Sequence, residues 1–318
     1  MANVYSADQI RAAVDEIDVT PLIEEGFVAY SEGRVVVPPV GELTFEDPPG
    51  DTHIKYGYIR GDDAFVIKIA SGFYANPTLG LPSSSGLMLL FSQQTGQLRA
   101  VLLDEGFLTN VRTAVAGRIA ARYLAPAEVS AIGVLGTGTM ARMQVAYLAS
   151  ETGCRDVVVW GRSDASLERY QRDMEALGYH VTPTREASAV GAACNLIVTT
   201  TPATVPLLRA CDVRPGTHIT AVGSDTAEKQ ELDAEILRAA DVVVADSIVQ
   251  CRDRGEIHHA VAAGALDLST VRELGEVIKA GRRARESDSA ITVADLTGVA
   301  VQDIQIAKAV HRRLCAPG

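Results

Sequence analysis

Hydrophobic and polar residues follow different patterns on the two sides of Leu108. Before Leu108, short apolar runs are separated by Gly, Pro, Asp and Ser, which is typical of strands joined by tight turns. Strands in close succession predict an antiparallel or mixed sheet. The runs are RVVVPPV, HIKYGYI, AFVIKI and GLMLLFS. They come after an N-terminal segment in which Ile10, Val14, Ile17 and Leu22 have the spacing of a helix.

After Leu108, helical and strand patterns alternate. The helical pattern TNVRTAVAGRIAARYLAP ends at Pro126, and strand-like runs and helices then take turns along the chain. This alternation predicts a parallel sheet covered by helices on both faces, and hence an α/β fold. The strand-like runs are VSAIGVLG, DVVVWG, NLIVTTT, THITAVGS, DVVVADS and ITVAD, and VQDIQIAKAVHRRL predicts a last helix that packs back on the first domain.

Length, composition and charge narrow the function. A chain of 318 residues, 47% hydrophobic and 22% charged, suits two globular domains. A net charge of −11 opposes a nucleic-acid partner, and five scattered cysteines without metal spacing indicate reduced thiols and no metal site. The N-terminus lacks a signal peptide's apolar core, and uncharged Ala187–Leu208 is too polar for a membrane span and predicts a strand and loop. A cytoplasmic protein is expected.

The segment GTGTMA, from Gly136 to Ala141, has the form GxGxxA between a strand-like run and a helix. There the first glycine permits a tight turn, the second admits a pyrophosphate, and the alanine lets helix and strand pack closely. The helix N-terminus adds unpaired N–H donors. We therefore predict a Rossmann-type, doubly wound dinucleotide-binding domain in which Gly136, Gly138, Thr139 and Met140 contact the cofactor. The alternative is a turn of small residues without a ligand.

The end of the second predicted strand of this domain bears on the choice of cofactor. NAD sites usually carry an acidic residue there to hold the ribose 2′-hydroxyl, but this chain has Gly161, Arg162 and Ser163. An arginine and a serine suit a 2′-phosphate, which favours NADP over NAD. The alternative role for Arg162 is that of an exposed turn residue stacked on adenine.

Lys68 is the only charged residue of FVIKIASGF, and it shares a strand face with Val66 and Ala70. A buried ammonium is costly unless a partner meets it, so Lys68 is a candidate catalytic residue. Lys55 has a similar setting in HIKYGYI. The alternative is an edge strand whose lysine extends to water or prevents edge pairing.

Arg112 and Asp225 are further candidates. If the helix begins near Thr109 or Asn110, Arg112 lies in its first turn, where the helix dipole disfavours a cation. A bound anion such as a substrate carboxylate would explain an arginine at this position. The alternative is an arginine exposed to solvent. Asp225 follows a predicted parallel strand at its ligand-binding end, although Asp225 and Glu228 also fit a helix-capping pattern.

Two further segments give weaker indications of function from their residues alone. The segment from Asp295 to Gly298 ends another predicted strand and places Thr297 beside the expected nicotinamide. The serines Ser83, Ser84 and Ser85 lie in a Gly/Pro-containing loop without a GxSxG motif, which disfavours a serine hydrolase.

Five segments together resemble the ornithine cyclodeaminase/μ-crystallin family. They lie between about residues 65 and 303 and include GFYANPTLGLPSSSGLMLL, FLTNVRTAVAGRIAARYLAP, GTGTMA, AVGSDTAEKQELD and DLTGVAVQD. The resemblance implies a homodimer of two-domain chains. Residues 123–298 would form the NAD(P)-binding Rossmann domain, and residues 1–122 with 299–318 would form an α/β substrate-binding and dimerisation domain.

The same resemblance assigns roles to single residues. Lys68 matches a lysine near the substrate carboxylate and reacting carbon, Arg112 a carboxylate-binding arginine, and Asp225 an acid/base aspartate at the substrate nitrogen. Lys55 and Ser84 are further candidate substrate contacts. The candidate cofactor contacts are Gly136, Gly138, Thr139, Met140, Arg162, Ser163, Thr200, Val222, Gly223 and Thr297.

Two positions depart from the family pattern. Val40 stands where many members carry an arginine that forms a second carboxylate clamp, and Lys55 stands where ornithine-cyclising members carry a carboxylate. A cation at that position disfavours a diamine substrate and suits an acidic or neutral side chain. The first domain looks closest to the branch linked to ectoine breakdown.

The leading hypothesis is an NAD(P)-dependent oxidoreductase, an imine reductase or amino-acid dehydrogenase, that acts on the C–N bond of a small α-amino or α-imino acid. The alternative is a cyclodeaminase for an ornithine- or diaminobutyrate-like substrate that uses NAD catalytically. A third hypothesis is a non-enzymatic NADP-binding protein similar to μ-crystallin.

Overall fold

The computed structural model describes residues 2–73 and 75–316, and the chain divides into two compact units. The first, Met1–Thr113 with Val299–Gly318, combines the beginning and the end of the chain, and the second is Ala114–Gly298. The boundary between them lies within helix α3 (Phe107–Leu124), whereas the sequence analysis places it after residue 122. Both units combine helices with a sheet, so the predicted α/β class is confirmed.

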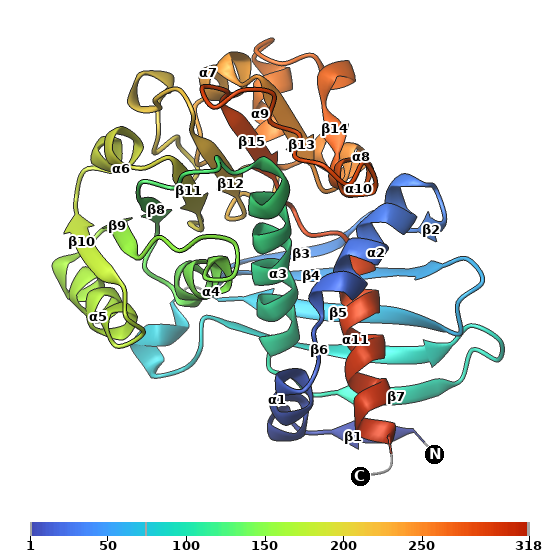
Figure 1. The fold of residues 1–318 in the computed structure, drawn as a ribbon. Coiled ribbons are helices and arrows are strands. Elements are labelled where there is room, and N and C mark those ends of the chain that lie inside the picture. Colours follow the sequence, from blue (N-terminus) through green and yellow to red (C-terminus); the bar gives the residue numbers. More distant parts are fainter. Residues whose placement is uncertain (1, 74, 317–318) are drawn as a thin grey trace. The chain divides into compact units, whose positions relative to one another are not determined.

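The first unit contains the predicted mixed sheet. Seven strands of its described residues form the order β1-β7-β6-β5-β4-β2, with β3 paired to β4. β1 and β7 are parallel and the other neighbours are antiparallel. Helix α11 lies along β4, β5 and β6, with α1 and α2 beside it (Figure 1). The strands are β1 (Asn3–Tyr5), β2 (Val35–Val36), β3 (Gly41–Glu46), β4 (Pro49–Ile59), β5 (Ala64–Gly72), β6 (Ser84–Ser92) and β7 (Leu98–Leu102); the helices are α1 (Ala7–Asp15), α2 (Thr20–Ser31), the short η1 (Asn76–Leu79) and α11 (Ala300–Cys315).

The second unit contains the predicted parallel sheet. Within the described chain its eight strands have the order β10-β9-β8-β11-β12-β15-β13-β14, and every neighbouring pair is parallel. The strands are β8 (Ile132–Leu135), β9 (Asp156–Trp160), β10 (His180–Thr184), β11 (Leu196–Thr199), β12 (His218–Ala221), β13 (Val242–Ala245), β14 (Arg272–Glu273) and β15 (Thr292–Asp295). The helices are α4 (Thr139–Leu148), α5 (Asp164–Glu175), α6 (Ala187–Ala193), η2 (Ala210–Asp212), α7 (Ala234–Ala239), α8 (Ile248–Cys251), α9 (Gly255–Ala262), η3 (Leu268–Thr270) and α10 (Leu274–Lys279).

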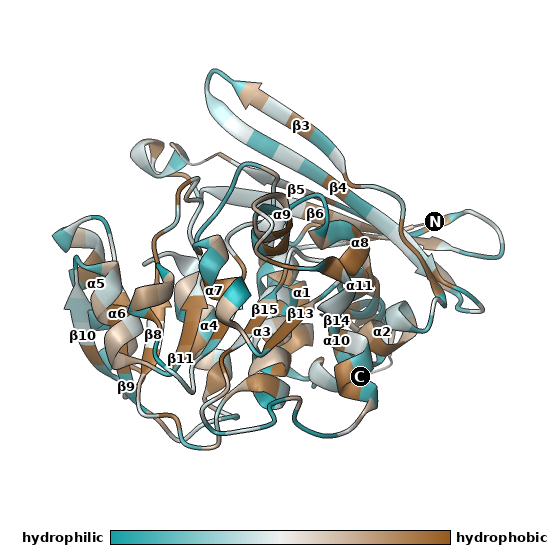
Figure 2. Cartoon of the chain, turned by 90° about the horizontal axis from the view of Figure 1, so that it is seen from above, coloured by the Kyte–Doolittle hydropathy of each residue, from teal (hydrophilic) through white to brown (hydrophobic). Residues whose placement is uncertain are grey.

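The two sheets differ in how their side chains are buried. The strands β8, β11, β12, β13 and β15 are buried at every residue, because a parallel sheet is covered on both faces. In contrast, β4 alternates between buried and more exposed residues over its second half. Figure 2 shows the difference as brown along β8 and β11 and as alternating bands on β3 and β4.

Two segments divide into more elements than their sequence patterns indicate. The single helical pattern at the N-terminus forms two helices, because the Asp18 carboxylate accepts from the N–H of Thr20 and Pro21 opens α2. The segment from Ala187, predicted as strand and loop, begins with α6, whose small residues give no clear helical period. Across residues 2–73 and 75–316, no helix combines the length and apolar character needed to cross a membrane.

A buried histidine makes the stability of the second unit depend on pH. The ring of His218 in β12 hydrogen-bonds the hydroxyls of Thr292 and Thr220 at 2.8 and 2.9 Å. Burial, with a smaller effect of Arg285, lowers the pKa of His218 to about 3. The unfolded chain binds this proton near pH 6.5, so it gains stability relative to the folded chain as the pH falls below that value.

We therefore predict that His218 reduces the free energy of unfolding by roughly 2 kcal/mol between pH 7 and pH 5. The variant His218→Gln cannot take up this proton, so denaturant titrations should show a pH dependence that is weaker by that amount. His180→Gln, at an exposed histidine, is the control and should behave as the wild type. Equal pH dependence in wild type and His218→Gln would contradict the assignment.

Candidate functional site

Lys68 lies in the middle of the sheet of the first unit. Strand β5 pairs with β4 on one side and with β6 on the other, which excludes the alternative of an edge strand. Val66 and Lys68 are almost fully buried, with 1% and 2% of their surfaces exposed. The face that carries them is the face covered by α11. Lys68 therefore has to be met by a charge inside the protein.

The partner of Lys68 is Asp303, in the first turn of α11. Its Oδ2 atom lies 3.7 Å from Lys68 Nζ, and its Oδ1 atom lies 3.1 Å from Arg112 Nε. Arg112 Nη1 also donates to Gln302 Oε1 at 2.8 Å. Three segments far apart in the chain, β5, α3 and α11, thus place two cations around one carboxylate.

The hydrogen-bonding capacity of this cluster is not filled by the described residues. Apart from the two ion pairs with Asp303, four buried atoms form no hydrogen bond with the described residues. They are Arg112 Nε, Gln302 Nε2 and both carboxylate oxygens of Asp303. Buried polar groups are normally paired, so such a concentration calls for an explanation. The donors of Arg112 and Gln302 suit a carboxylate, and the oxygens of Asp303 suit an N–H group.

The predicted position of Arg112 in its helix is wrong. Helix α3 begins at Phe107, so Arg112 lies in the second turn rather than the first. The earlier start is explained by Asp104, whose carboxylate accepts from the N–H of Leu108 at 2.7 Å. Burial raises the pKa of Asp104, with a smaller contribution from Asp303. The argument from the helix dipole therefore does not apply, and the pairing with Asp303 and Gln302 replaces it.

The other candidate residues of the first unit lie at different distances from Lys68. Lys55 in β4 is 4% exposed and lies directly opposite Lys68 in the strand register. Like charges directly opposite repel each other, so this pair adds positive potential to the cluster. Ser84 is exposed and pairs with Gly72, four positions along β5 from Lys68, which corresponds to roughly 13 Å. Val40 lies between β2 and β3 and is partly buried.

The GTGTMA segment forms the predicted strand-to-helix turn between β8 and α4. Gly136 has φ = +115°, and a Cβ atom there would lie 2.6 Å from Thr200 Oγ1, so only glycine fits. Gly138 is the N-cap of α4 without a side-chain cap, and a Cβ atom there would meet nothing within 4 Å. Ala141 is fully buried against β8 and its neighbours. The open space at Gly138 and the uncapped N–H groups of Thr139 and Met140 fit a bound pyrophosphate.

The predicted residues at the end of β9 have different surroundings. Arg162 is exposed, whereas Ser163 is the N-cap of α5 and accepts from the N–H of Ser166. The hydroxyl of Ser163 is thus already used in the fold. Asp164, the next residue, pairs with Arg185 at 3.0 Å. Arg162 remains as the candidate for contact with a 2′-phosphate.

The remaining cofactor candidates follow three other strands of the same sheet edge. Thr200 follows β11, Val222 and Gly223 follow β12, and Thr297 follows β15. The hydroxyl of Thr297 donates to Asp246 Oδ1 at 3.2 Å and accepts from Gln250 at 2.7 Å. All these residues lie at the carboxyl ends of adjacent parallel strands, where α/β sheets bind ligands.

Asp225 lies in a loop after β12. No helix follows it before Ala234, so the capping interpretation with Glu228 is wrong. Lys229 Nζ donates to Asp225 Oδ1 at 2.7 Å, and about a third of the Asp225 side chain is exposed. Arg254 donates to the Asp225 carbonyl at 3.1 Å. Within residues 2–73 and 75–316, no group of three or more His, Cys, Asp or Glu side chains suits a metal ion.

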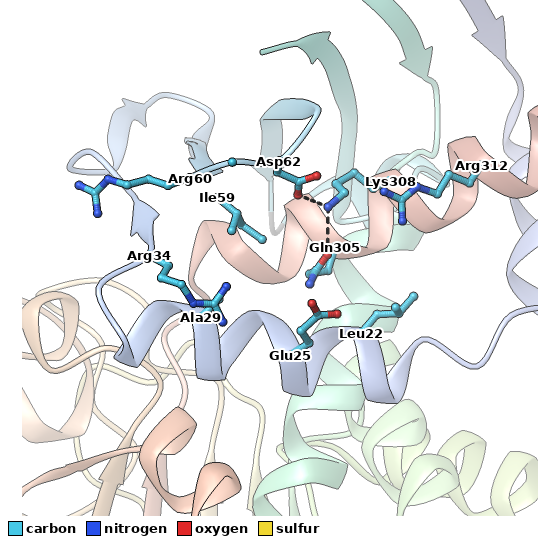
Figure 3. A pocket seen from close by; sticks show the side chains of 11 residues that line it. Leu22, Glu25, Ala29, Arg34, Ile59, Arg60, Asp62, Gln305, Lys308 and Arg312 are labelled. Carbon is cyan, nitrogen blue, oxygen red and sulfur yellow. Dashed lines mark hydrogen bonds and ion pairs between the residues drawn. The ribbon is translucent and has the colours of Figure 1, made fainter. Parts of the chain in front are cut away.

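A separate pocket of about 270 Å³ in the first unit is lined by charged residues of α2, α11 and the β4–β5 turn (Figure 3). Its cations have partners, since Lys308 pairs with Asp62 and Arg34 pairs with Glu32. None of the predicted site residues lines it. The pocket therefore does not mark the site.

Asp303 and Gln302 were missed as candidates from the sequence. Both belong to the segment DLTGVAVQD, but within VQDIQIAKAV they occupy polar positions that a helical pattern places in solvent. In the structure α11 is buried at every residue from Ala300 to Val310, including these two. The only signal was that Asp303 is the single acidic residue of this helix.

The fold and this set of residues define an α/β protein with a Rossmann-type parallel sheet and a second unit that holds the buried cluster of Lys68, Arg112 and Asp303. A family model described as "Ornithine cyclodeaminase/mu-crystallin family" matches residues 2–317. The chain therefore belongs to the ornithine cyclodeaminase/mu-crystallin family, as its sequence motifs indicate.

Relatives in this family have different named activities. An uncharacterized cyclodeaminase of Sinorhizobium fredii is 39% identical over 98% of this chain and 95% of its own. An archaeal alanine dehydrogenase dimer solved with bound NAD has 33% identity and a TM-score of 0.88, covering 98% and 95%. A Thermococcus litoralis Δ1-pyrroline-2-carboxylate reductase, solved with NADH and L-proline, has 25% identity and a TM-score of 0.91, covering 98% and 97%.

The cluster around Asp303 leads to a prediction about stability. Asp303→Asn leaves Lys68 and Arg112 buried without their carboxylate, which should lower the free energy of unfolding by about 3 kcal/mol. In the double variant Lys68→Met/Asp303→Asn, the loss should be smaller than the sum of the single losses by at least about 1 kcal/mol. Denaturant unfolding of the four proteins measures both quantities.

Asp63→Asn is the matched control, because it removes a carboxylate that also faces two arginines but is half-exposed. It should cost less than about 1 kcal/mol. A loss for Asp303→Asn no larger than for Asp63→Asn would show that the buried cluster does not need its carboxylate.

Proposed function

We propose that this protein is an NAD(P)-dependent oxidoreductase that acts on the C–N bond of a small α-amino or α-imino acid. The supporting observation is the buried cluster of Lys68, Arg112 and Asp303, in which Arg112 Nε and the two oxygens of Asp303 are ion-paired but form no hydrogen bond with the described residues. An amino or imino acid carries the complementary groups, a carboxylate and an N–H, on one carbon.

Each residue has a proposed role in this reaction. Arg112 binds the substrate carboxylate, and Lys68 stabilises negative charge beside the α-carbon. Asp225 exchanges a proton with the substrate nitrogen. The nicotinamide, when bound, supplies or accepts the hydride. The turn at Gly136 and Gly138 with the N-terminus of α4 holds the pyrophosphate.

The proposed substrate has an acidic or neutral side chain. Lys55 is buried opposite Lys68, so a side-chain ammonium bound there would meet a second cation. An anionic side chain would instead reduce the repulsion between the two lysines. We expect oxo acids with a side-chain carboxylate to be preferred over those with a side-chain amine.

The second candidate is a cyclodeaminase, because a relative with that name is 39% identical to the chain. Such an enzyme oxidises the amine, loses ammonia on cyclisation and reduces the ring, without net change in the nicotinamide. A non-enzymatic NADP-binding protein is the third possibility. The assay below gives a different result for each of the three.

A homodimer is also part of the proposal. The sheet face opposite α11 carries large apolar side chains, and Leu43, Phe45, Tyr56 and Tyr58 are 55, 41, 37 and 37% exposed. The rings of Phe65 and Phe91 stack on neighbouring strands of this face at 4.9 Å. A second copy would cover such a surface, and the archaeal alanine dehydrogenase is described as a dimer. Cytoplasmic location remains a prediction from the sequence.

The reaction is tested with reduced nicotinamide, ammonia or methylamine, and 2-oxo acids whose side chains are neutral, acidic or basic. We expect stoichiometric loss of reduced-nicotinamide absorbance, fastest with the neutral or acidic oxo acids. In parallel, ornithine and diaminobutyrate are incubated with NAD, and released ammonia is measured. Ammonia without net reduction would indicate the cyclodeaminase, and no turnover with tight cofactor binding would indicate the binding protein.

The roles of Arg112 and Asp225 are tested in whichever assay is positive. Arg112→Lys should raise KM for the acid at least about tenfold, because lysine cannot bind the carboxylate with two parallel hydrogen bonds. Asp225→Asn should lower kcat by about a hundredfold. Arg118→Lys, on the same helix but paired with Glu151, should be nearly unchanged. Full activity of Asp225→Asn would refute its role in proton transfer.

The proposed preference for NADP is tested by measuring the dissociation constants of NADPH and NADH. We expect NADPH to bind more tightly, and Arg162→Ala to weaken NADPH binding about tenfold while NADH changes less than about twofold. Arg172→Ala, in the last turn of α5, is a control for loss of a nearby charge. Tighter binding of NADH by the wild type would overturn the preference.

A further inference from the structure

Glu231 is a buried carboxylate at the cofactor edge of the second unit, and the site described above does not use it. Its side chain is fully buried and accepts hydrogen bonds from four donors. Oε1 accepts from the N–H and the hydroxyl of Thr201 at 2.6 and 2.7 Å. Oε2 accepts from the hydroxyl of Thr199 at 2.6 Å and from the N–H of Gly223 at 3.0 Å.

These four contacts join the ends of two adjacent strands. Thr199 is the last residue of β11 and Thr201 lies just after it, and Gly223 lies just after β12. A Cβ atom on Gly223 would lie 2.3 Å from the Thr201 carbonyl and 2.5 Å from Glu231 Oε2, so the two loops are held in close contact. The carboxylate is the common acceptor between them.

The same contacts reach the turn between β8 and α4. Gly136 packs so closely against Thr200 and Thr201 that a Cβ atom would lie 2.6 Å from Thr200 Oγ1 and 3.3 Å from the Thr201 methyl group. Glu231 therefore fixes the residues that form one wall of the phosphate-binding turn. Three strand ends, those of β8, β11 and β12, are positioned through one side chain.

The titratable groups around Glu231 are mostly carboxyl groups, and burial raises the pKa of both Glu256 and Asp295 well above its usual value. Glu256 of α9 accepts from the N–H groups of Glu231 and Leu232 at 2.8 and 3.0 Å, and Asp295 of β15 helps to raise the pKa of Glu256. Lys229 lies two residues before Glu231 but pairs with Asp225. Burial raises the pKa of Glu231 to about 7, while its four donors favour the ionised form. The carboxyl group thus changes charge near neutral pH.

We infer that Glu231 is a positioning residue for dinucleotide binding, whose ionised carboxylate holds the ends of β11 and β12 and the phosphate turn in the geometry that accepts the cofactor. The inference rests only on the cofactor-binding part of the proposed function. It requires neither a particular substrate nor turnover.

Glu231→Gln is the sharpest test because of the two backbone donors. Oε1 faces the N–H of Thr201 and Oε2 faces the N–H of Gly223, and neither N–H can accept a hydrogen bond. A glutamine must point its NH2 group at one of them in either orientation. We expect the dissociation constant of NADH, measured by fluorescence titration, to rise about tenfold at pH 8, the usual effect of leaving one buried donor unpaired.

The pH dependence provides a readout that a purely structural role would not change. If the ionised carboxylate is required, wild-type affinity should fall up to about tenfold from pH 8 to pH 6, and Glu231→Gln should lose this dependence. Glu256 and Asp295 remain in both proteins, and Glu231→Gln removes the charge that helps to raise their pKa values. Equal pH dependence in the two proteins would overturn the inference.

Two further variants decide the matter if Glu231→Gln does not fold. Thr199→Val removes one donor to Glu231 and should weaken NADH binding about threefold. Thr220→Val removes a buried hydroxyl of β12 that bonds His218 instead, so it should lower the melting temperature but leave NADH binding within about twofold. Equal effects of both variants on NADH binding would refute the role of Glu231.

The outcomes separate this inference from the proposed reaction. Normal NADH binding with these variant effects, but no imine reduction, would refute the reaction and support Glu231. Imine reduction with unchanged NADH affinity in Glu231→Gln would refute Glu231 alone. A wild-type protein that binds neither NADH nor NADPH would refute both.

Discussion

A charged group that is buried away from water needs an opposite charge inside the protein. In the first unit, Asp303 supplies this charge for two buried cations. Its carboxylate lies between Lys68 of β5 and Arg112 of α3, so a helix from the end of the chain completes a sheet built near its beginning. Without that helix, two buried cations would face an uncovered sheet. The same interaction joins fold and site, because the groups that pair with Asp303 are those proposed to bind the substrate.

The sequence predicts the two-domain α/β organisation because hydrophobic periodicity and glycine spacing are local properties. Such local patterns predict the turn at Gly136, the strand of Lys68 and the helix of Arg112. The partner of the two cations does not, because Asp303 lies in a segment whose polar positions a helical pattern assigns to water. Only the burial of α11 on both sides, which results from tertiary packing, reveals that Gln302 and Asp303 face the interior.

Strand register is a second feature that the pattern could not supply. Lys55 and Lys68 have similar surroundings in the sequence, but nothing local shows that they lie directly opposite each other. That pairing is fixed by the β4–β5 hairpin and by burial of one sheet face. Likewise, the position of α3 depends on the Asp104 carboxylate at its start, which moves Arg112 out of the first turn.

The role proposed for the cluster of Lys68, Arg112 and Asp303 is the same for any α-amino or α-imino acid, so it does not distinguish reduction from cyclodeamination. Both reactions need the acid's carboxylate bound and its α-carbon exposed to hydride transfer. They differ in the side chain, because cyclisation requires a second amine. Lys55 is the residue of this group that bears on that difference. Because it is buried opposite another lysine, we propose that it disfavours a second ammonium and favours a carboxylate. In this proposal the choice between the two reactions depends on the charge that Lys55 and Lys68 place on one strand pair.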